Sequence, residues 1–286
     1  MRWSTSGRER RKLIVACAQY AVRDGDPETN LQRSARAIRE ATDGGADLVV
    51  LPELANSGCD FYSREQALRL AEEVGETGEN AGPTLRAWRE VAKESGVFVI
   101  GGFLEREGAS LFNSAAVIGP GLFRRYRKTH LWAREKLLYE AGRDLPVFDT
   151  PLGKIGVLIC YDAWFPEAAR TLALRGADLL CVPANAPDDW VPEAQRRGGL
   201  TILNVHAVSH ANANRLFVAC ANRVGDDYLG RSCVVDPTGG VLAFGSEAEE
   251  EVLKAEIDVE RSRREKRLVE HSHAFGDRND DAYRVF

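Results

Sequence analysis

The sequence predicts an α/β protein built as a four-layer α-β-β-α sandwich, in which two similar halves pack sheet to sheet. Short apolar runs alternate with amphipathic segments along all 286 residues. Several runs are apolar at successive positions, which is typical of strands covered on both faces. One pattern occurs twice, as GADLVVLPE at 45–53 and GADLLCVPA at 176–184. Each copy is expected to be a buried strand stopped by proline, so the repeat indicates two halves of similar build.

The expected strands are short apolar runs bounded by turn residues. They cover residues 13–20, 47–53, 96–105, 113–119, 154–162, 178–185, 216–223, 231–237 and 252–258. The expected helices open on a proline, which favours the first helical turn, or place apolar side chains on one face. They cover residues 27–42, 83–96, 166–176 and 192–214.

No linker or low-complexity tract interrupts the chain, so residues 12–286 are expected to form one domain with a C-terminal tail. Residues 1–11 are polar and are expected to form a flexible N-terminal extension. The net charge of −5 lacks the basic footprint of a nucleic-acid-binding protein. No apolar run reaches the roughly 18 to 20 residues that span a bilayer, so no membrane partner is expected.

The cysteines and histidines favour neither a disulfide framework nor a metal site. Six cysteines are present, without C-x-x-C or zinc-like spacing, and a reducing cytoplasm fits this usage best. Three of them, Cys17, Cys181 and Cys220, lie in apolar runs, where cysteine usually acts as a small apolar residue. His206 and His210 have the spacing of a metal pair, but no suitable glutamate accompanies them, so packing or an interface is favoured.

Three polar residues follow three separate strand-like runs, at the strand ends where α/β sheets place ligand sites. Glu53 comes directly after Pro52. Taken alone, a glutamate at this position would cap a loop as readily as it would take part in catalysis. Cys160 lies at a strand-to-helix turn before Pro166, where a nucleophile is well exposed to substrate and close to backbone N–H groups. Lys128 follows a hairpin strand in RRYRKTHLW, and alone it would be an ordinary surface residue.

From about Lys12 to Tyr283, the chain resembles the nitrilase superfamily of carbon–nitrogen hydrolases. The resemblance rests on LVVLPELANSG around Glu53, YRKTHLW around Lys128 and IGVLICYDAWFPEAAR around Cys160, in that order. It implies an α-β-β-α sandwich whose protomers pair into larger αββα–αββα assemblies. A homodimer or larger homo-oligomer is therefore expected.

The resemblance also implies a catalytic set of Glu53, Lys128 and Cys160, with Glu135 contacting the lysine on the substrate side. Glu53 would act as general base while Cys160 attacks an amide carbon, and water would then hydrolyse the thioester. Lys128 and the backbone N–H of Tyr161 would stabilise the oxyanion. This chemistry needs no metal or organic cofactor.

The expected substrate is a small carboxamide or carbamoyl amide, cleaved with release of ammonia. Tyr161-Asp162 after the cysteine is similar to the amidase and carbamoylase branches, including N-carbamoylputrescine amidases, whereas true nitrilases commonly have Trp-Glu. A nitrilase is the alternative within the family, because the same thiolate can attack a nitrile carbon. Outside it, the alternatives are a non-catalytic scaffold of the same fold and a redox thiol protein.

Four residues are expected to bind substrate. They are Tyr161, Trp132, Asn185 and Trp190. Asn185 and Trp190 follow the second copy of the repeat, where PANAPDDW is expected to shape the pocket mouth. The tryptophans could instead fill the core or an interface, which is the commoner use of such residues.

Overall fold

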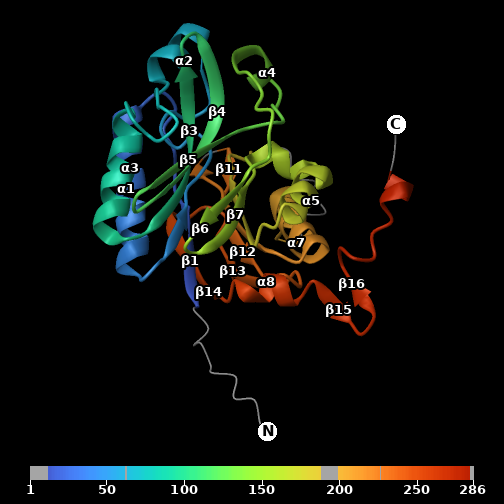
Figure 1. The fold of residues 1–286 in the computed structure, drawn as a ribbon. Helices are drawn as coiled ribbons and strands as arrows, with labels where there is room; N and C mark the ends of the chain where they lie inside the picture. The colour runs from blue at the N-terminus through green and yellow to red at the C-terminus, as the bar shows by residue number, and fades with distance from the viewer. Residues whose placement is uncertain (1–11, 62, 188–198, 226, 284–286) are drawn as a thin grey trace.

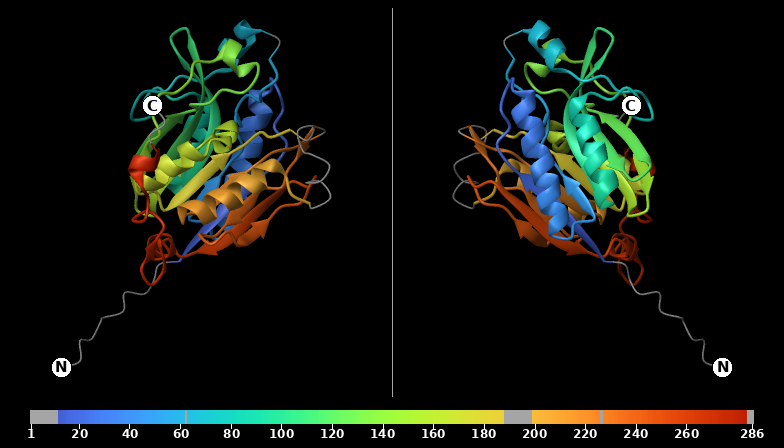
Figure 2. Two further views of the ribbon diagram at one scale, coloured as in Figure 1. Left: turned by 90° about the vertical axis from the view of Figure 1, so that its right-hand side faces the viewer. Right: turned by 90° about the vertical axis from the view of Figure 1, so that its left-hand side faces the viewer.

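The computed structural model of the protein describes residues 12–283 except 62, 188–198 and 226. Two six-stranded sheets face each other, and helices cover the outer face of each sheet (Figure 1). In each of the two opposite views of Figure 2, a different helical layer faces the viewer. The predicted four-layer sandwich is therefore confirmed. The extension expected at residues 1–11 lies outside the described residues.

The first sheet and its helices come from the first half of the chain and one late strand. They are β1 (Leu13–Gln19), α1 (Pro27–Asp43), β2 (Leu48–Val50), α3 (Pro83–Ser95), β3 (Phe98–Glu107), β4 (Ser110–Gly119), β5 (Leu122–Arg127) and β14 (Glu251–Ile257). The strand order is β14-β1-β2-β3-β4-β5. The pairs β1–β2 and β2–β3 are parallel, and the other neighbours are antiparallel. Helices α1 and α3 cover the outer face with fully buried Ile38 and Trp88.

The second sheet repeats this plan. Its elements are β6 (Val147–Thr150), β7 (Gly153–Val157), α5 (Pro166–Leu174), β8 (Leu179–Pro183), α7 (Ile202–Asn214), β9 (Phe217–Ala221), β12 (Cys233–Val235) and β13 (Val241–Phe244). The order is β13-β12-β9-β8-β7-β6, in which β7–β8 and β8–β9 are parallel and the rest antiparallel. Helices α5 and α7 cover its outer face.

The duplicated sequence pattern occupies equivalent places in the two sheets, β2 in one and β8 in the other. The side chain of Asp47 accepts a hydrogen bond from the N–H of Ile14, at 2.8 Å, in the neighbouring parallel strand. Asp178 accepts the same bond from the N–H of Lys154, at 3.0 Å. In each half, the aspartate of the shared Gly-Ala-Asp therefore forms a hydrogen bond that fixes its strand against the parallel neighbour.

The core between the sheets is apolar and closed. Strands of both sheets contribute alternate residues to it, among them Val15, Val50, Val157 and Ala219. Cys17 and Cys181 lie in this layer and Cys220 lies beneath α7, all fully buried, as expected of small apolar side chains. All six cysteines fall within the described residues and none is in a disulfide.

The remaining elements are short. They are α2 (Arg64–Leu70), α4 (Glu135–Leu138), η1 (Cys160–Trp164), β10 (Val224–Gly225), β11 (Tyr228–Leu229), α8 (Glu260–Arg264), β15 (Arg267–Val269), β16 (Ser272–His273) and η2 (Asp280–Tyr283). The segment from β15 to η2 runs along the outside of the sandwich, on the side of α5 and α7 (Figure 1). No helix in the described part of the chain has the length and apolar character needed to cross a membrane.

The predicted element boundaries differ most from the structure at α7 and β7. The helix expected at 192–214 begins only at Ile202 where it is described, because Thr201 caps it by accepting the N–H of Asn204, at 3.3 Å. Residues 192–198 lie outside the described residues. The strand expected at 154–162 ends at Val157, since Cys160 opens a 3₁₀ turn.

Candidate active site

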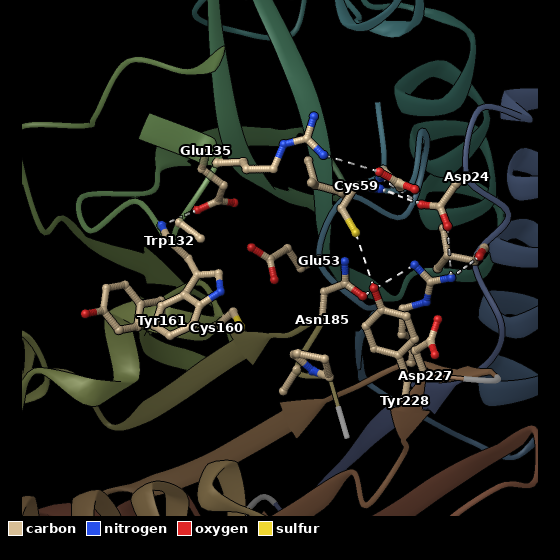
Figure 3. A pocket seen from close by; sticks show the side chains of 18 of the residues that line it. Asp24, Glu53, Cys59, Trp132, Glu135, Cys160, Tyr161, Asn185, Asp227 and Tyr228 are labelled. Carbon is tan, nitrogen blue, oxygen red and sulfur yellow. Dashed lines mark hydrogen bonds and ion pairs between the residues drawn. The ribbon is translucent and has the colours of Figure 1, made fainter. Parts of the chain in front are cut away.

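A cavity of about 790 Å³ is lined by all four residues that were expected to be catalytic. They come from four places, with Glu53 after β2, Lys128 after β5, Glu135 at the start of α4, and Cys160 after β7. Figure 3 shows Glu53, Glu135 and Cys160 around the same space. The fold thus brings together residues that lie far apart in the sequence.

Glu53 is held by the close packing of two backbones. Its N–H donates to the carbonyl oxygen of Ala184, at 3.2 Å, which is the equivalent position in the second half. A Cβ atom on Gly102 would lie 2.5 Å from the Cα of Glu53, so only glycine fits against this turn. Glu53 is 3 % exposed, and its charge therefore depends on protein partners rather than on water.

Lys128 provides the main partner. Its backbone N–H donates to the carbonyl of Asn113, at 2.8 Å, which continues the pairing of β4 with β5. Its Nζ lies 2.7 Å from Glu53 Oε1 and 2.9 Å from Glu135 Oε2. Because the lysine side chain is only 1 % exposed, these two carboxylates replace water as the partners of its ammonium group.

Asn113 is a member of this cluster that the sequence interpretation missed. Its Nδ2 donates to Glu53 Oε1 at 2.6 Å and to Glu135 Oε1 at 2.7 Å, so it spaces the two carboxylates. The available signal was a buried polar residue inside the otherwise apolar run NSAAVIG of β4. A buried amide in such a run needs partners of its own, which makes it a candidate for a polar site.

Burial and charge act in opposite directions on these groups. Burial opposes the charge of Lys128, but the carboxylates of Glu53 and Glu135 outweigh it and raise the pKa of the lysine. Burial raises the pKa of Glu53, and Lys128 offsets this only in part. The cluster therefore combines a permanent ammonium with a carboxylate that binds a proton more readily than usual.

Cys160 lies in a strained turn after β7. Its φ of +45° falls in the left-handed region, which residues other than glycine rarely adopt and which is common at functional sites. Burial, followed by the charge of Glu53, raises the pKa of the thiol well above its usual range. Lys128 and the backbone N–H of Asn185 act in the opposite direction. The resting sulfur is therefore a thiol that needs a base to become a nucleophile.

Asp162 holds this turn in place. One oxygen of its fully buried carboxylate accepts from the N–H of Ile159 at 2.9 Å and the hydroxyl of Tyr126 at 2.7 Å. The other accepts from the hydroxyl of Thr129 at 2.9 Å and the N–H of His130 at 2.8 Å. One side chain therefore ties the cysteine turn to the end of β5 and to the segment that follows it.

Replacing Asp162 by alanine is expected to lower both stability and turnover. Several buried donors would lose their acceptor, at a cost of about 2 to 5 kcal/mol in the free energy of unfolding. Without this anchor the turn relaxes, so kcat for an amide should fall more than KM rises. Chemical unfolding and steady-state kinetics measure both effects. Asp149→Ala, at a side chain that is 82 % exposed, is the control, and equal behaviour of the two variants would contradict the role given to Asp162.

Three of the four residues expected to bind substrate line the cavity. They are Trp132, Tyr161 and Asn185. The rings of Trp132 and Tyr161 meet edge to face at 4.6 Å and form an aromatic wall beside Cys160 (Figure 3). Trp190 lies outside the described residues, so its place at the pocket mouth stays a prediction.

His206 and His210 lie on α7 and pack against η1. His210 Nε2 is 2.6 Å from the carbonyl oxygen of Ala163, and the two imidazole rings stack at 6.0 Å. Burial lowers the pKa of His206 to about 4, so this ring is neutral at pH 7. In the residues that the structure describes, no group of three or more His, Cys, Asp or Glu side chains has an arrangement that could hold a metal ion.

These features place the chain among α/β enzymes whose site combines a thiol with a buried lysine and two carboxylates. The family model described as carbon-nitrogen hydrolase matches residues 14–267. The chain belongs to this family and is an enzyme that acts on C–N bonds other than peptide bonds. The resemblance to the nitrilase superfamily is thereby confirmed.

Similar proteins cover almost the whole chain. A protein of Pyrococcus abyssi named nitrilase is 39% identical, over 94% of this chain and 98% of its own length. The N-carbamoylputrescine amidase of Arabidopsis thaliana is 32% identical, over 98% of this chain and 97% of its own length. The crystal structure of Saccharomyces cerevisiae Nit3, a member of branch 10 of the nitrilase superfamily, matches with a TM-score of 0.76 at 28% identity, covering 88% of this chain and 92% of that one.

Proposed function

We propose that this enzyme is an amidase that hydrolyses a small carboxamide or carbamoyl amide through a thioester on Cys160 and releases ammonia. The observation that supports this best is the buried ammonium of Lys128, 2.7 Å from Glu53 and 2.9 Å from Glu135, in a cavity that Cys160 also lines. A base and a cation thereby line the same cavity as the thiol, and acyl transfer needs both kinds of group.

In the proposed reaction, Glu53 takes the thiol proton as the sulfur of Cys160 attacks the amide carbon. The resulting oxyanion is stabilised by Lys128 and by the backbone N–H of Tyr161, at about 3 kcal/mol for each well-placed donor. Glu53 then gives its proton to the leaving nitrogen, and ammonia departs as the C–N bond breaks. Glu53 next takes a proton from water, whose oxygen attacks the thioester, and the acid leaves as the thiol is restored.

A nitrilase is the second candidate, because a relative of that name is 39% identical to this chain. Matched pairs of amides and nitriles with the same acyl group distinguish the two functions. We expect ammonia release from the amides and an acyl adduct on Cys160 that mass spectrometry detects. Ammonia release from the nitriles alone would overturn the proposal.

The pH dependence of the rate tests the role of Glu53. The base must be ionised, and burial raises the pKa of Glu53. The value of kcat/KM should therefore rise with pH through an apparent pKa above the ordinary glutamate value of about 4.3. Since the thiol pKa is also raised, no fall is expected near the ordinary thiol value of about 8.5.

Glu135→Gln tests this explanation of the pH profile. The charge of Glu135 contributes to the raised pKa of Glu53, so its removal should move the acid limb to lower pH. Because the groups titrate as a set, the limb reports the cluster rather than one residue. An acid limb that lies at or below the ordinary glutamate value, or that does not move in Glu135→Gln, would contradict this account.

We also propose that the enzyme works as a homodimer or larger homo-oligomer in the cytoplasm. The proposal rests on the family to which the chain belongs and on six cysteines that are all unpaired. Light scattering of the purified protein tests the assembly, and a monomer at working concentration would contradict it.

A further inference from the structure

The segment that follows β5 and the turn that follows β7 lie against each other beside the reactive groups. His130 comes two residues after Lys128, and Asp162 comes two residues after Cys160. The backbone N–H of His130 and its ring nitrogen Nδ1 both lie 2.8 Å from Asp162 Oδ1. The side chain of Asp162 is fully buried, whereas that of His130 is 31 % exposed. This contact therefore joins the segment of the lysine to the turn of the cysteine.

The ring nitrogen of His130 donates a hydrogen bond in this contact. Asp162 Oδ1 also accepts from the hydroxyl of Thr129, at 2.9 Å, and an ionised carboxylate can only accept. Nδ1 of His130 therefore carries its hydrogen, and the carboxylate fixes the orientation of the ring. Because all three donors to this oxygen come from Thr129 and His130, the oxygen depends on the segment after Lys128 for its hydrogen bonds.

The face of the same ring contacts the far end of the cysteine turn. The imidazole of His130 stacks on Phe165, with ring centres 3.8 Å apart and planes 13° apart. Phe165 ends η1 and precedes α5, and its ring meets that of Tyr161 edge to face at 5.2 Å. Aromatic pairs of this kind contribute beyond the area that they bury. His130 therefore holds η1 at two points, Asp162 and Phe165.

The two donors of the proposed oxyanion site come from different sheets. Lys128 follows β5 of the first sheet, and the N–H of Tyr161 belongs to η1, which follows β7 of the second. A donor stabilises an oxyanion only within about 2.7 to 3.1 Å of the oxygen, so the two elements must keep a fixed separation. Misplacement by about 1 Å can cost about 100-fold in rate. The contact of His130 with Asp162 joins the two elements close to both donors.

We propose that His130 is a positioning residue for the oxyanion site. By contacting Asp162 and Phe165, His130 fixes η1 against the segment that carries Lys128. The N–H of Tyr161 thereby stays within reach of the oxyanion that Lys128 also binds. His130 does not line the cavity, so it acts through its neighbours and touches neither substrate nor sulfur. This inference rests on the proposed amidase function and adds a residue to its machinery.

A thiol–imidazole pair is the competing role for a histidine near a reactive cysteine. Nδ1 of His130 is already bound to Asp162, and the face of the ring is covered by Phe165. Glu53 lines the cavity together with Cys160, whereas His130 does not. The structure therefore favours an effect of His130 on the oxyanion donors over an effect on the sulfur, and the test distinguishes the two.

Two substitutions of His130 separate its two contacts. His130→Phe keeps a ring against Phe165 but loses the donor to Asp162. With the fastest of propanamide, butanamide and benzamide as substrate, kcat should fall by about 10- to 100-fold, the range for one hydrogen bond to a charged group. KM should stay within about 2-fold, because an oxyanion contact forms only in the transition state.

His130→Asn places an amide nitrogen near the position of Nδ1 and loses only the ring. It should rescue most of the activity, with a fall in kcat of about 2- to 10-fold for the lost stacking. The control is His271→Asn, at a side chain that is 89 % exposed, which should keep the wild-type kcat. A His130→Asn variant as slow as His130→Phe would overturn the role given to the hydrogen bond.

Methylthiolation of Cys160 shows whether the sulfur itself is affected. In this reaction with methyl methanethiosulfonate, the cysteine sulfur forms an S–S bond, methanesulfinate leaves and the thiol proton passes to a base, so no oxyanion forms on carbon. The rate at Cys160, followed by mass spectrometry of its peptide, should stay within about 2-fold of wild type in both His130 variants, because loss of an oxyanion contact affects only reactions that form an oxyanion. A fall in parallel with kcat would assign His130 to the sulfur and overturn the proposal.

Double substitutions test whether His130 acts through its neighbours. In an Asp162→Ala background, His130→Phe should lower kcat by no more than about 2-fold further, because the acceptor has already gone. Phe165→Leu removes the ring beneath the imidazole, so it should lower kcat in the wild type but not further in His130→Asn. This second pair decides the question even if His130→Phe does not fold.

The outcomes separate the two proposals. If the wild type hydrolyses no amide, the amidase function fails. The contact is then tested by chemical unfolding, in which the effects of His130→Phe and Asp162→Ala should again be non-additive, and full additivity would overturn it. If amides are hydrolysed but His130→Phe keeps the wild-type kcat, or if its effect adds in full to that of Asp162→Ala, the positioning role is overturned alone.

Discussion

Cys160→Ala is expected to abolish amide hydrolysis and leave the fold intact. The substitution removes the only proposed nucleophile, and loss of such a group typically costs about 10⁴-fold or more in kcat. The removed sulfur lines a cavity and belongs to a residue that is only partly buried, so the unfolding transition should change little. Ammonia release, circular dichroism and mass spectrometry of the enzyme with substrate measure the three effects.

Cys59→Ala is the matched control, because Cys59 is the other cysteine on the cavity wall. It should keep both ammonia release and the acyl adduct, which the Cys160 variant should lose. A redox thiol mechanism predicts instead that both cysteines are needed. Substantial turnover by Cys160→Ala would rule out the thioester mechanism.

Among substitutions of the site residues, Lys128→Met should cause the largest loss of stability. It should also lower the rate of turnover strongly. The ammonium separates the buried carboxylate of Glu53 from that of Glu135, which is 16 % exposed, and its removal leaves both uncompensated, at a cost of about 3 to 5 kcal/mol in the free energy of unfolding. Turnover should fall by at least about 10²- to 10³-fold, the usual effect of losing one oxyanion donor. Chemical denaturation and kinetics measure the two losses.

The pH dependence of this loss has a definite sign. Without Lys128, the pKa of Glu53 is raised further in the folded state and not in the unfolded state. Stability of the variant is then greatest below the ordinary glutamate pKa and decreases as the pH rises through the raised value. Adding Glu53→Gln should recover much of the stability and none of the activity. A Lys128→Met protein as stable as the wild type at every pH would contradict the arrangement described for this cluster.

The sequence allowed prediction of features that depend on local pattern. Strand-like runs that end in Glu53 and Cys160 follow from the apolar periodicity and the prolines, and the repeat of Gly-Ala-Asp indicated the two halves. The edge strands β6 and β13 were missed, because each is only 4 residues long, and the exposed Asp149 interrupts the apolar run of β6. Edge strands carry little of the signal that burial imposes.

The partners that hold the site together could not be predicted from the sequence. Asn113 contacts a glutamate 60 residues away, and Asp162 binds a tyrosine 36 residues away. Such contacts depend on the register of β4 against β5 and on the turn at Cys160, neither of which a local rule specifies.

The bond from the N–H of Glu53 to the carbonyl of Ala184 joins equivalent residues of the two halves. The contact brings the two strand ends together, and Glu53 and Asn185, the residue after Ala184, both line the cavity. A second carboxylate at position 184 would therefore lie beside the first and repel it. The doubled architecture therefore has room for one acidic side chain where the two strand ends meet, and the chain places glutamate in the first half and alanine in the second.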